Sequence, residues 1–195
     1  MTDLITLSDY KISQGITSLQ HDTRLTSLIA SVSQLVKTYC NNSFVDYTTT
    51  SKTEVFDVVY GENFVQLTES PIISVTSVSE RDEPTDIYTG LVENTHYYVD
   101  VKTDSIYRVS GSVDTPFKTG RGAVSVVYTA GYTNGIPKDL QLAVIDLITY
   151  YHKDEHKTRQ TIAGASIQNQ STTSQRDNVG FPDHIKRVLD LYKNF

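Results

Sequence analysis

Apolar residues recur along this chain with two different periods. In two long runs they return every three or four positions, which is the spacing of one face of an α-helix. These runs predict helices over 22–40 and 137–156. Their apolar faces comprise Leu25, Leu28, Ile29, Val32, Leu35, Val36 and Tyr39 in the first helix, and Leu140, Ala143, Val144, Leu147, Ile148 and Tyr151 in the second. Both faces need burial, so we expect the helices to pack together through Leu28, Val32, Leu35, Leu140, Val144 and Leu147.

The residues between these helices follow a period of two. Short alternating runs separated by turn residues fill the block 44–130 and are typical of a small antiparallel sheet or barrel. The clearest run is the last, in which Val124, Val126, Tyr128 and Ala130 alternate with more polar positions. Before the first long helix, a shorter one is predicted over 8–14, because Ser8-Asp9 can cap its start and Gly15 can end it.

The C-terminal part of the chain changes character. The segment 158–181 is rich in Thr, Ser, Gln and Asn and is too polar to fold alone. Pro182-Asp183 then opens a last helix, whose apolar residues are Ile185, Val188, Leu189 and Tyr192, with Phe195 at the end. A helix on a polar linker is a common form of docking arm. The same spacing also allows the helix to fold back onto its own domain.

This order of elements predicts an α+β fold. N-terminal helices and a central helix pack together, and an antiparallel β-domain is inserted between them. We expect a core over 1–157, containing the helices 8–14, 22–40 and 137–156 and the β block. The remaining residues, 158–195, are expected to form the polar linker and a tethered C-terminal helix that serves as a docking arm.

Composition narrows the functional classes. The 195 residues include 17 basic and 23 acidic side chains, giving a formal charge of −6. No cluster of Lys and Arg is present to grip duplex DNA. A single cysteine, Cys40, rules out an internal disulfide and suits a reducing compartment. We find neither a signal peptide nor an apolar run of the roughly 20 residues that a membrane helix needs.

Few residues suggest catalysis. His152 and His156 belong to an H-x-x-E-H sequence, the inverted zinc-protease signature. Such a site needs a third ligand, and only 39 residues lie downstream; they contain Asp177, Asp183 and Asp190 and no Glu. Cys40 has no His placed to activate it. The acidic run Glu80, Asp82, Glu83 and Asp86 lacks the ligand spacing of an EF-hand, so it is interpreted as a solvated loop. We expect no catalytic residue, metal or cofactor, and a zinc-dependent hydrolase is kept as an alternative.

Three sequence segments resemble those of a known protein family. They are the opening 4–11 with the helix that follows it, the strand phrase 67–78, and Val126 to Tyr132 followed by Ile136-Pro137-Lys138-Asp139-Leu140. Taken in this order across residues 4–157, the chain resembles the head–tail connector (adaptor) proteins of tailed bacteriophages.

The resemblance implies a structural role in the virion neck, after assembly in the host cytoplasm. Such proteins form a ring, usually dodecameric, beneath the portal, where they extend the DNA channel and join the filled head to the tail. The implied partners are the portal protein, neighbouring copies, and the next connector, stopper or tail-completion protein. DNA passes without specific binding, because acidic subunits repel phosphate. The docking stripe would comprise Ile185, Val188, Leu189, Tyr192 and Phe195, facing either the portal or a neighbouring subunit.

Two further alternatives remain open. One is another neck or tail-completion protein of the same particle, although helices flanking the β block argue against a pure tail-tube sandwich. The other is a carbohydrate-binding β module. The 13 Tyr residues allow such a module, but it would normally use Trp, and the chain has none.

Overall fold

The computed structural model of the chain describes residues 2–154, 159–162, 165–168 and 181–194. The chain forms two compact units. A helical unit combines Met1–Asn42 with Gly135–Lys193, and a β unit comprises Ser43–Asn134 with Asn194–Phe195. The β unit is therefore inserted between two helical segments, and the predicted α+β fold is confirmed.

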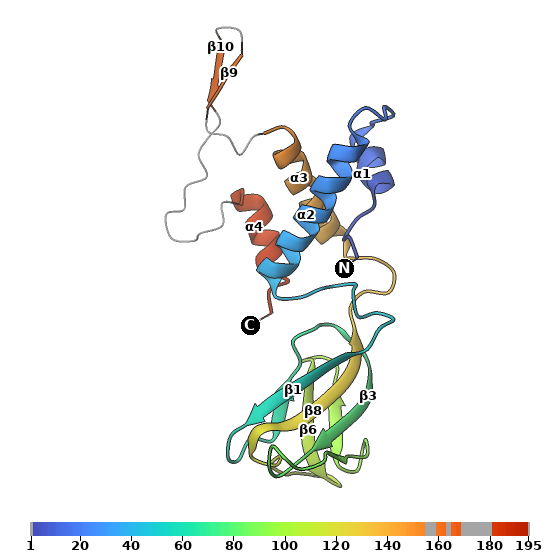
Figure 1. Ribbon diagram of the computed structural model, residues 1–195, viewed down its shortest axis with the longest axis vertical. Helices are drawn as coiled ribbons and strands as arrows, with labels where there is room; N and C mark the ends of the chain where they lie inside the picture. Colours follow the sequence, from blue (N-terminus) through green and yellow to red (C-terminus); the bar gives the residue numbers. More distant parts are fainter. Residues whose placement is uncertain (1, 155–158, 163–164, 169–180, 195) are drawn as a thin grey trace. The chain divides into compact units, whose positions relative to one another are not determined.

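The helical unit contains four helices among the described residues (Figure 1). They are α1 (Leu7–Gln14), α2 (Asp22–Cys40), α3 (Lys138–His152) and α4 (Asp183–Asp190). Helix α1 begins with a capping box, because Thr6 accepts a hydrogen bond from the Asp9 amide and the Asp9 side chain accepts one from the Thr6 amide. The cap is thus Thr6 rather than the predicted Ser8-Asp9. None of the helices in the described part of the chain is long and apolar enough to cross a bilayer.

The long helices α2 and α3 pack on each other, as predicted, with a small difference in the contacting face. The buried residues of α2 include Leu25, Ile29, Val32, Val36 and Cys40. Leu28 and Leu35, expected at the centre of the contact, are only half-buried. The difference arises because α2 also contacts α1 and α4, so its buried stripe is set by three neighbours rather than by α3 alone.

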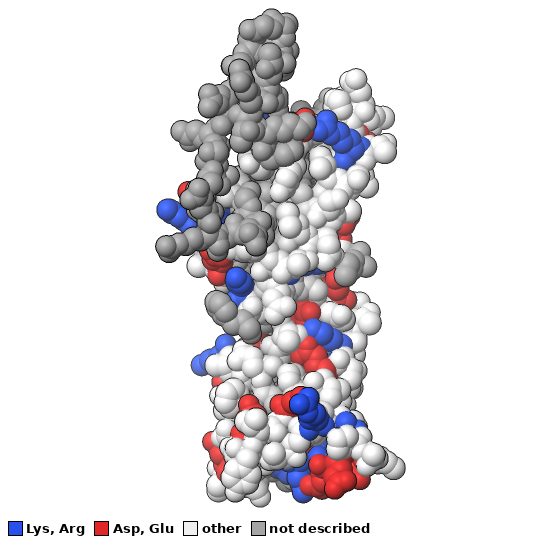
Figure 2. All heavy atoms as spheres, turned by 60° about the vertical axis from the view of Figure 1, so that its left-hand side comes forward, with Lys and Arg blue, Asp and Glu red and all other residues white. Residues whose placement is uncertain are grey.

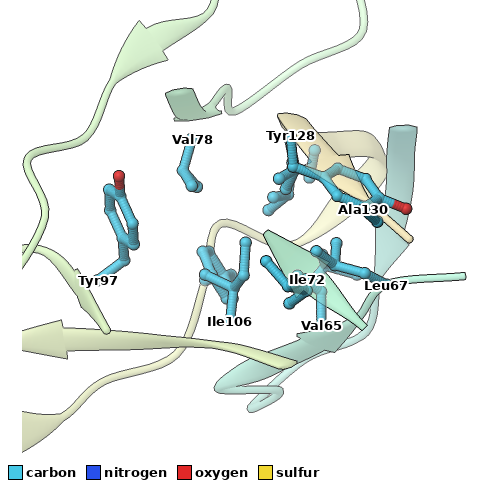
Figure 3. Close-up of a cluster of buried hydrophobic side chains, with 13 residues drawn as sticks. Val65, Leu67, Ile72, Val78, Tyr97, Ile106, Tyr128 and Ala130 are labelled. Atoms are coloured by element: carbon cyan, nitrogen blue, oxygen red, sulfur yellow. The ribbon is translucent and has the colours of Figure 1, made fainter. Parts of the chain in front are cut away.

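The β unit is built from two antiparallel four-stranded sheets. In the first sheet the order is β1-β8-β3-β4, and in the second β2-β6-β5 are joined by β7, which pairs with β6. The strands are β1 (Lys52–Val58), β2 (Phe64–Gln66), β3 (Ile72–Glu80), β4 (Thr89–Gly90), β5 (Tyr97–Asp100), β6 (Ser105–Ser110), β7 (Val113–Asp114) and β8 (Gly120–Ala130). Side chains from both sheets form one apolar core, which includes Val65, Ile106, Val78 and Tyr128 (Figure 3).

The chain enters and leaves the β unit at one tight junction. The carbonyl of Phe44 accepts a hydrogen bond from the Tyr132 amide at 2.7 Å, and the Gly131 amide donates to the Pro71 carbonyl at 2.8 Å. Phe44 itself has a positive φ of 61° and is buried. Gly131 has a φ of 112°, and a Cβ at this position would lie 2.3 Å from the Phe44 oxygen. Only glycine therefore fits here without distortion.

Part of the predicted polar linker forms a hairpin. Strand β9 (Arg159–Ile162) pairs with β10 (Ala165–Gln168) in an antiparallel two-stranded sheet. Apart from this hairpin and Phe181, the segment 158–181 lies outside the described residues.

Candidate assembly surfaces

The predicted docking stripe on α4 faces the chain's own helical unit. Ile185 and Leu189 are 1% and 0% exposed, and α4 contacts both α2 and α3. Val188 and Tyr192 are half-buried, and Phe195 lies outside the described residues. Ile185 and Leu189 can therefore reach a portal or a neighbouring subunit only if α4 leaves this position, and their docking role stays a prediction.

Polar and aromatic contacts also hold α4 in place. The Tyr39 hydroxyl donates to Asp190 at 2.5 Å, and the Tyr39 and Phe181 rings meet edge to face with centroids 5.0 Å apart. The Tyr192 hydroxyl donates to the Asp139 carboxylate at 2.7 Å, and this hydrogen bond lowers the pKa of Asp139. Two features of the sequence could have indicated this packing of α4. Phe181, Ile185 and Leu189 are spaced four residues apart, and position 39 is aromatic.

Cys40 is buried against α4, and its thiol is unreactive. Its thiol is buried and donates to the Leu189 carbonyl, with 3.6 Å between sulfur and oxygen. Burial, with a smaller contribution from the Asp190 carboxylate, raises the pKa of Cys40 to about 12. A thiol in that state is neutral at physiological pH and is not a nucleophile.

The opposite side of α4 presents an outward stripe. His184, Arg187 and Leu191 follow each other at positions i, i+3 and i+7, and all three are exposed. Leu191, the C-cap residue of the helix, is 77% exposed. We call these three residues the α4 outer face.

A shallow apolar groove lies between α1 and α3. It has a volume of about 320 Å³ and is lined by Asp9, Ile12, Ser13, Lys138, Gln141, Leu142 and Ile145. Ile12 is 77% exposed and Leu142 60% exposed, so two large aliphatic side chains project at this α1–α3 groove. Helix α1 is fixed beneath them by the buried Tyr10, whose hydroxyl lies 3.1 Å from that of Thr149 in α3.

The β unit exposes a row of aromatic side chains. Phe64 of β2, Tyr107 of β6 and Tyr98 of β5 are direct cross-strand neighbours. The Phe64 and Tyr107 rings are stacked, with centroids 5.6 Å apart, while Phe64 and Tyr98 are 40% and 53% exposed. Exposed aromatic rows of this kind are enriched at protein–protein contacts. The strand register that aligns these three rings could not be read from the sequence.

Several basic side chains in the described residues lie beside acidic ones. Arg108 contacts Glu80 at 3.1 Å and Lys118 contacts Asp82 at 2.8 Å. The predicted solvated acidic loop is therefore wrong for Glu80, which ends β3 and is buried against Arg108. Blue and red side chains are interspersed over the described surface visible in Figure 2. Local pairing leaves these cations partly neutralised, which weakens any attraction to phosphate.

The structure describes only one end of the H-x-x-E-H sequence. His152 is at the end of α3, where its ring meets that of His21 edge-on at 5.7 Å. Burial, followed by the charges of Arg24 and His21, lowers the pKa of His152. Glu155 and His156 lie outside the described residues. Within the described ranges, no group of three or more His, Cys, Asp or Glu side chains is placed to hold a metal ion.

We predict that the histidine pair has no role in metal binding. Replacing both His152 and His156 with Ala should leave the purified protein folded and its assembly unchanged, because no third ligand lies beside His152 among the residues that the structure describes. Metal analysis by plasma mass spectrometry provides the check. Stoichiometric zinc in the wild-type protein that disappears in the double variant would contradict the prediction.

Comparisons with known proteins agree with the sequence resemblance. The sequence profile of the family described as "Head completion protein" matches residues 3–195. The head completion protein of Escherichia phage T5 is 31% identical over 83 residues, covering 43% of this chain and 46% of that protein. The matched region thus spans about half the length of this curated relative.

Solved structures show the same fold at low sequence identity. A chain from the neck of an empty gene transfer agent particle, computed with C6 symmetry, has a TM-score of 0.60 at 14% identity, covering 98% of this chain and 90% of that chain. A chain from the neck of the native particle, computed with C12 symmetry, has a TM-score of 0.55 at 13% identity, covering 97% and 88%.

The family match covers nearly all of the chain, and the structural neighbours reproduce its α+β arrangement. The resemblance to head–tail connectors is therefore confirmed at the level of the family. This family consists of structural virion proteins rather than enzymes, so the zinc hydrolase and carbohydrate-binding alternatives lose their support. The chain belongs to the head completion protein family.

Proposed function

We propose that this chain is a ring-forming adaptor in the neck of a tailed phage, placed beneath the portal protein. It extends the DNA channel and joins the DNA-filled head to the tail. The observation that carries the proposal is the family match over residues 3–195. The solved neck particles with the same fold were computed with C6 and C12 symmetry, and a dodecameric ring is compatible with both.

The two units suit different contacts in such a ring. The helical unit presents the α1–α3 groove and the α4 outer face to neighbouring copies or to the portal. The β unit presents the row of Phe64, Tyr107 and Tyr98 to the next connector, stopper or tail-completion protein. A net charge of −6 per chain lets DNA pass through the channel without being held.

The apolar stripe of α4 also allows a second mode of docking. In that mode α4 leaves its place and presents Ile185, Val188, Leu189, Tyr192 and Phe195 to the portal or a neighbouring subunit. The burial of Ile185 and Leu189 makes this mode costly, because α2 and α3 would lose their cover. We therefore favour contacts made with α4 in place.

A particle that lacks this chain tests the proposed function. We expect phage deleted for the gene to accumulate DNA-filled heads without tails, because the joint between portal and tail is missing. Adding the purified protein to those heads should restore tail joining. Quantitative mass spectrometry of repaired particles should give a dodecameric amount per head, consistent with a ring.

Two results would contradict the proposal. Tailed particles that form normally without the chain would remove it from the joint. A single copy, or a tail-length array of copies, would instead favour a different neck or tail protein of the same particle.

A further inference from the structure

The helical unit carries two different exposed apolar features on opposite sides. Helices α2 and α3 form its centre, with α1 on one side and α4 on the other (Figure 1). Because Ile185 and Leu189 point into this centre, the α4 outer face points away from it. On the other side, Tyr10 of α1 is buried and Ile12, two positions later, is 77% exposed. The helical unit thus displays a projecting leucine on one side and an apolar groove on the other.

The two features match in chemistry as well as in form. Leu191 is a single aliphatic side chain that stands out from the surface. The α1–α3 groove, at about 320 Å³, is large enough to accept one or two such side chains between Ile12 and Leu142. Beside them, Arg187 is exposed on the α4 outer face, and Asp9, whose carboxylate also accepts from Thr6, is exposed at the groove. The one cation in the groove lining, Lys138, donates to Gln141. An apolar contact flanked by opposite charges is the usual anatomy of a specific interface.

We propose that Leu191 of one copy inserts into the α1–α3 groove of the next copy, with Arg187 placed against Asp9. This inference rests on the proposed ring. A ring closes by head-to-tail contacts, which need two different complementary surfaces on each subunit. A two-fold dimer would instead need one surface that is complementary to itself. The helical unit has the first arrangement, so the occupant of the groove is a second copy of this chain.

Engineered cysteine pairs can test this contact without interference from the native cysteine. Cys40 is 0% exposed, so engineered thiols are the reactive ones. Ile12→Cys and Leu191→Cys, both at exposed positions, should leave the melting temperature close to that of the wild type. Under mild oxidation each single variant should stay monomeric on a non-reducing gel. A mixture of the two should give covalent dimers, and the double variant should give a ladder that ends at the full ring.

Control variants distinguish a specific cross-link from one formed by random collision. They also distinguish failure of this contact from failure of the proposed ring function. Leu191→Cys mixed with Ile87→Cys, whose parent residue is 92% exposed in the β unit, should not link. A ring that assembles with no link between positions 12 and 191 would overturn the contact but leave the ring function standing. Self-linking of Ile12→Cys alone would show a two-fold contact and also overturn it. A chain that forms no ring under any condition would remove the proposed function and this contact together.

A charge reversal provides an independent measurement. Arg187→Glu places a carboxylate against Asp9, so the subunit concentration for half-assembly should rise roughly three- to tenfold at low salt. The increase should shrink at high salt because the ions screen the pair. Arg121→Glu is the matched control, since the Arg121 side chain is 91% exposed in the β unit, and it should leave assembly unchanged. Equal effects of the two reversals would count against the Arg187–Asp9 contact.

Discussion

Replacing Gly131 with alanine should destabilise the β unit by about 2–6 kcal/mol, because two separate penalties fall on one methyl group. A Cβ at this position would lie 2.3 Å from the Phe44 oxygen and 2.9 Å from its carbonyl carbon. Both atoms belong to the backbone, so no side chain can rotate away. The φ of 112° adds strain for any residue with a side chain. Relief requires breaking the hydrogen bond between Tyr132 and Phe44, which closes the unit.

Gly111 provides the matched control for this substitution. It also has a positive φ, 63°, but a Cβ there would meet nothing within 4 Å. Gly111→Ala should therefore cost only about 1–2 kcal/mol, the strain of the left-handed conformation alone. Urea unfolding followed by circular dichroism measures both variants, since the chain has no Trp to report by fluorescence. Similar losses for the two variants would show that the junction at Phe44 can relax.

The sequence predicted those elements whose signals are local. The period of 3.6 residues placed α2 and α3, and the period of two placed the β block, because each pattern reflects one buried face. The split into two sheets was not predictable, since nothing in alternation says which strand lies beside which. Glu80 is an example. As part of a charged run it was interpreted as solvated, yet the pairing of β3 with β8 and the fold of β6 bury it beside Arg108.

For the candidate surfaces too, local features were predictable and features that depend on tertiary packing were not. The apolar stripe of α4 was identified correctly, but spacing cannot say whether a stripe is covered by its own chain or by a partner. Packing between α2, α3 and α4 decided this, through residues more than a hundred positions apart such as Tyr39 and Asp190. The α1–α3 groove was missed for a related reason. Ile12 and Leu142 are unremarkable in the sequence and become a feature only when the two helices meet.

The position of α4 changes the result expected from a truncation. If the helix were a free docking arm, deleting residues 158–195 would leave the melting behaviour of the core unchanged. In the structure, Leu189 and Ile185 cover the apolar residues of α2 and α3, including Cys40. Truncation should therefore expose that surface, lower the melting temperature and promote aggregation. A point substitution tests the same idea without removing the linker.

Leu189→Asp should cost more than about 4 kcal/mol of stability, because it removes a fully buried leucine and buries an unpaired carboxylate in its place. Leu189 is 0% exposed, while Leu191, two positions later, is 77% exposed. Leu191→Asp, at the C-cap of the same helix, is thus a control for the effect of a new negative charge, and in the unassembled protein it should change the stability by no more than about 0.5 kcal/mol. Thermal unfolding of both variants at low protein concentration compares their stabilities. Hydrogen exchange is a second measurement: if α4 packs on its own unit, the amides of Asp183–Asp190 should be strongly protected in the wild type. If the two variants melt alike and the helix exchanges freely, α4 is not held by its own unit, and its apolar stripe would be available to a partner as the docking arm.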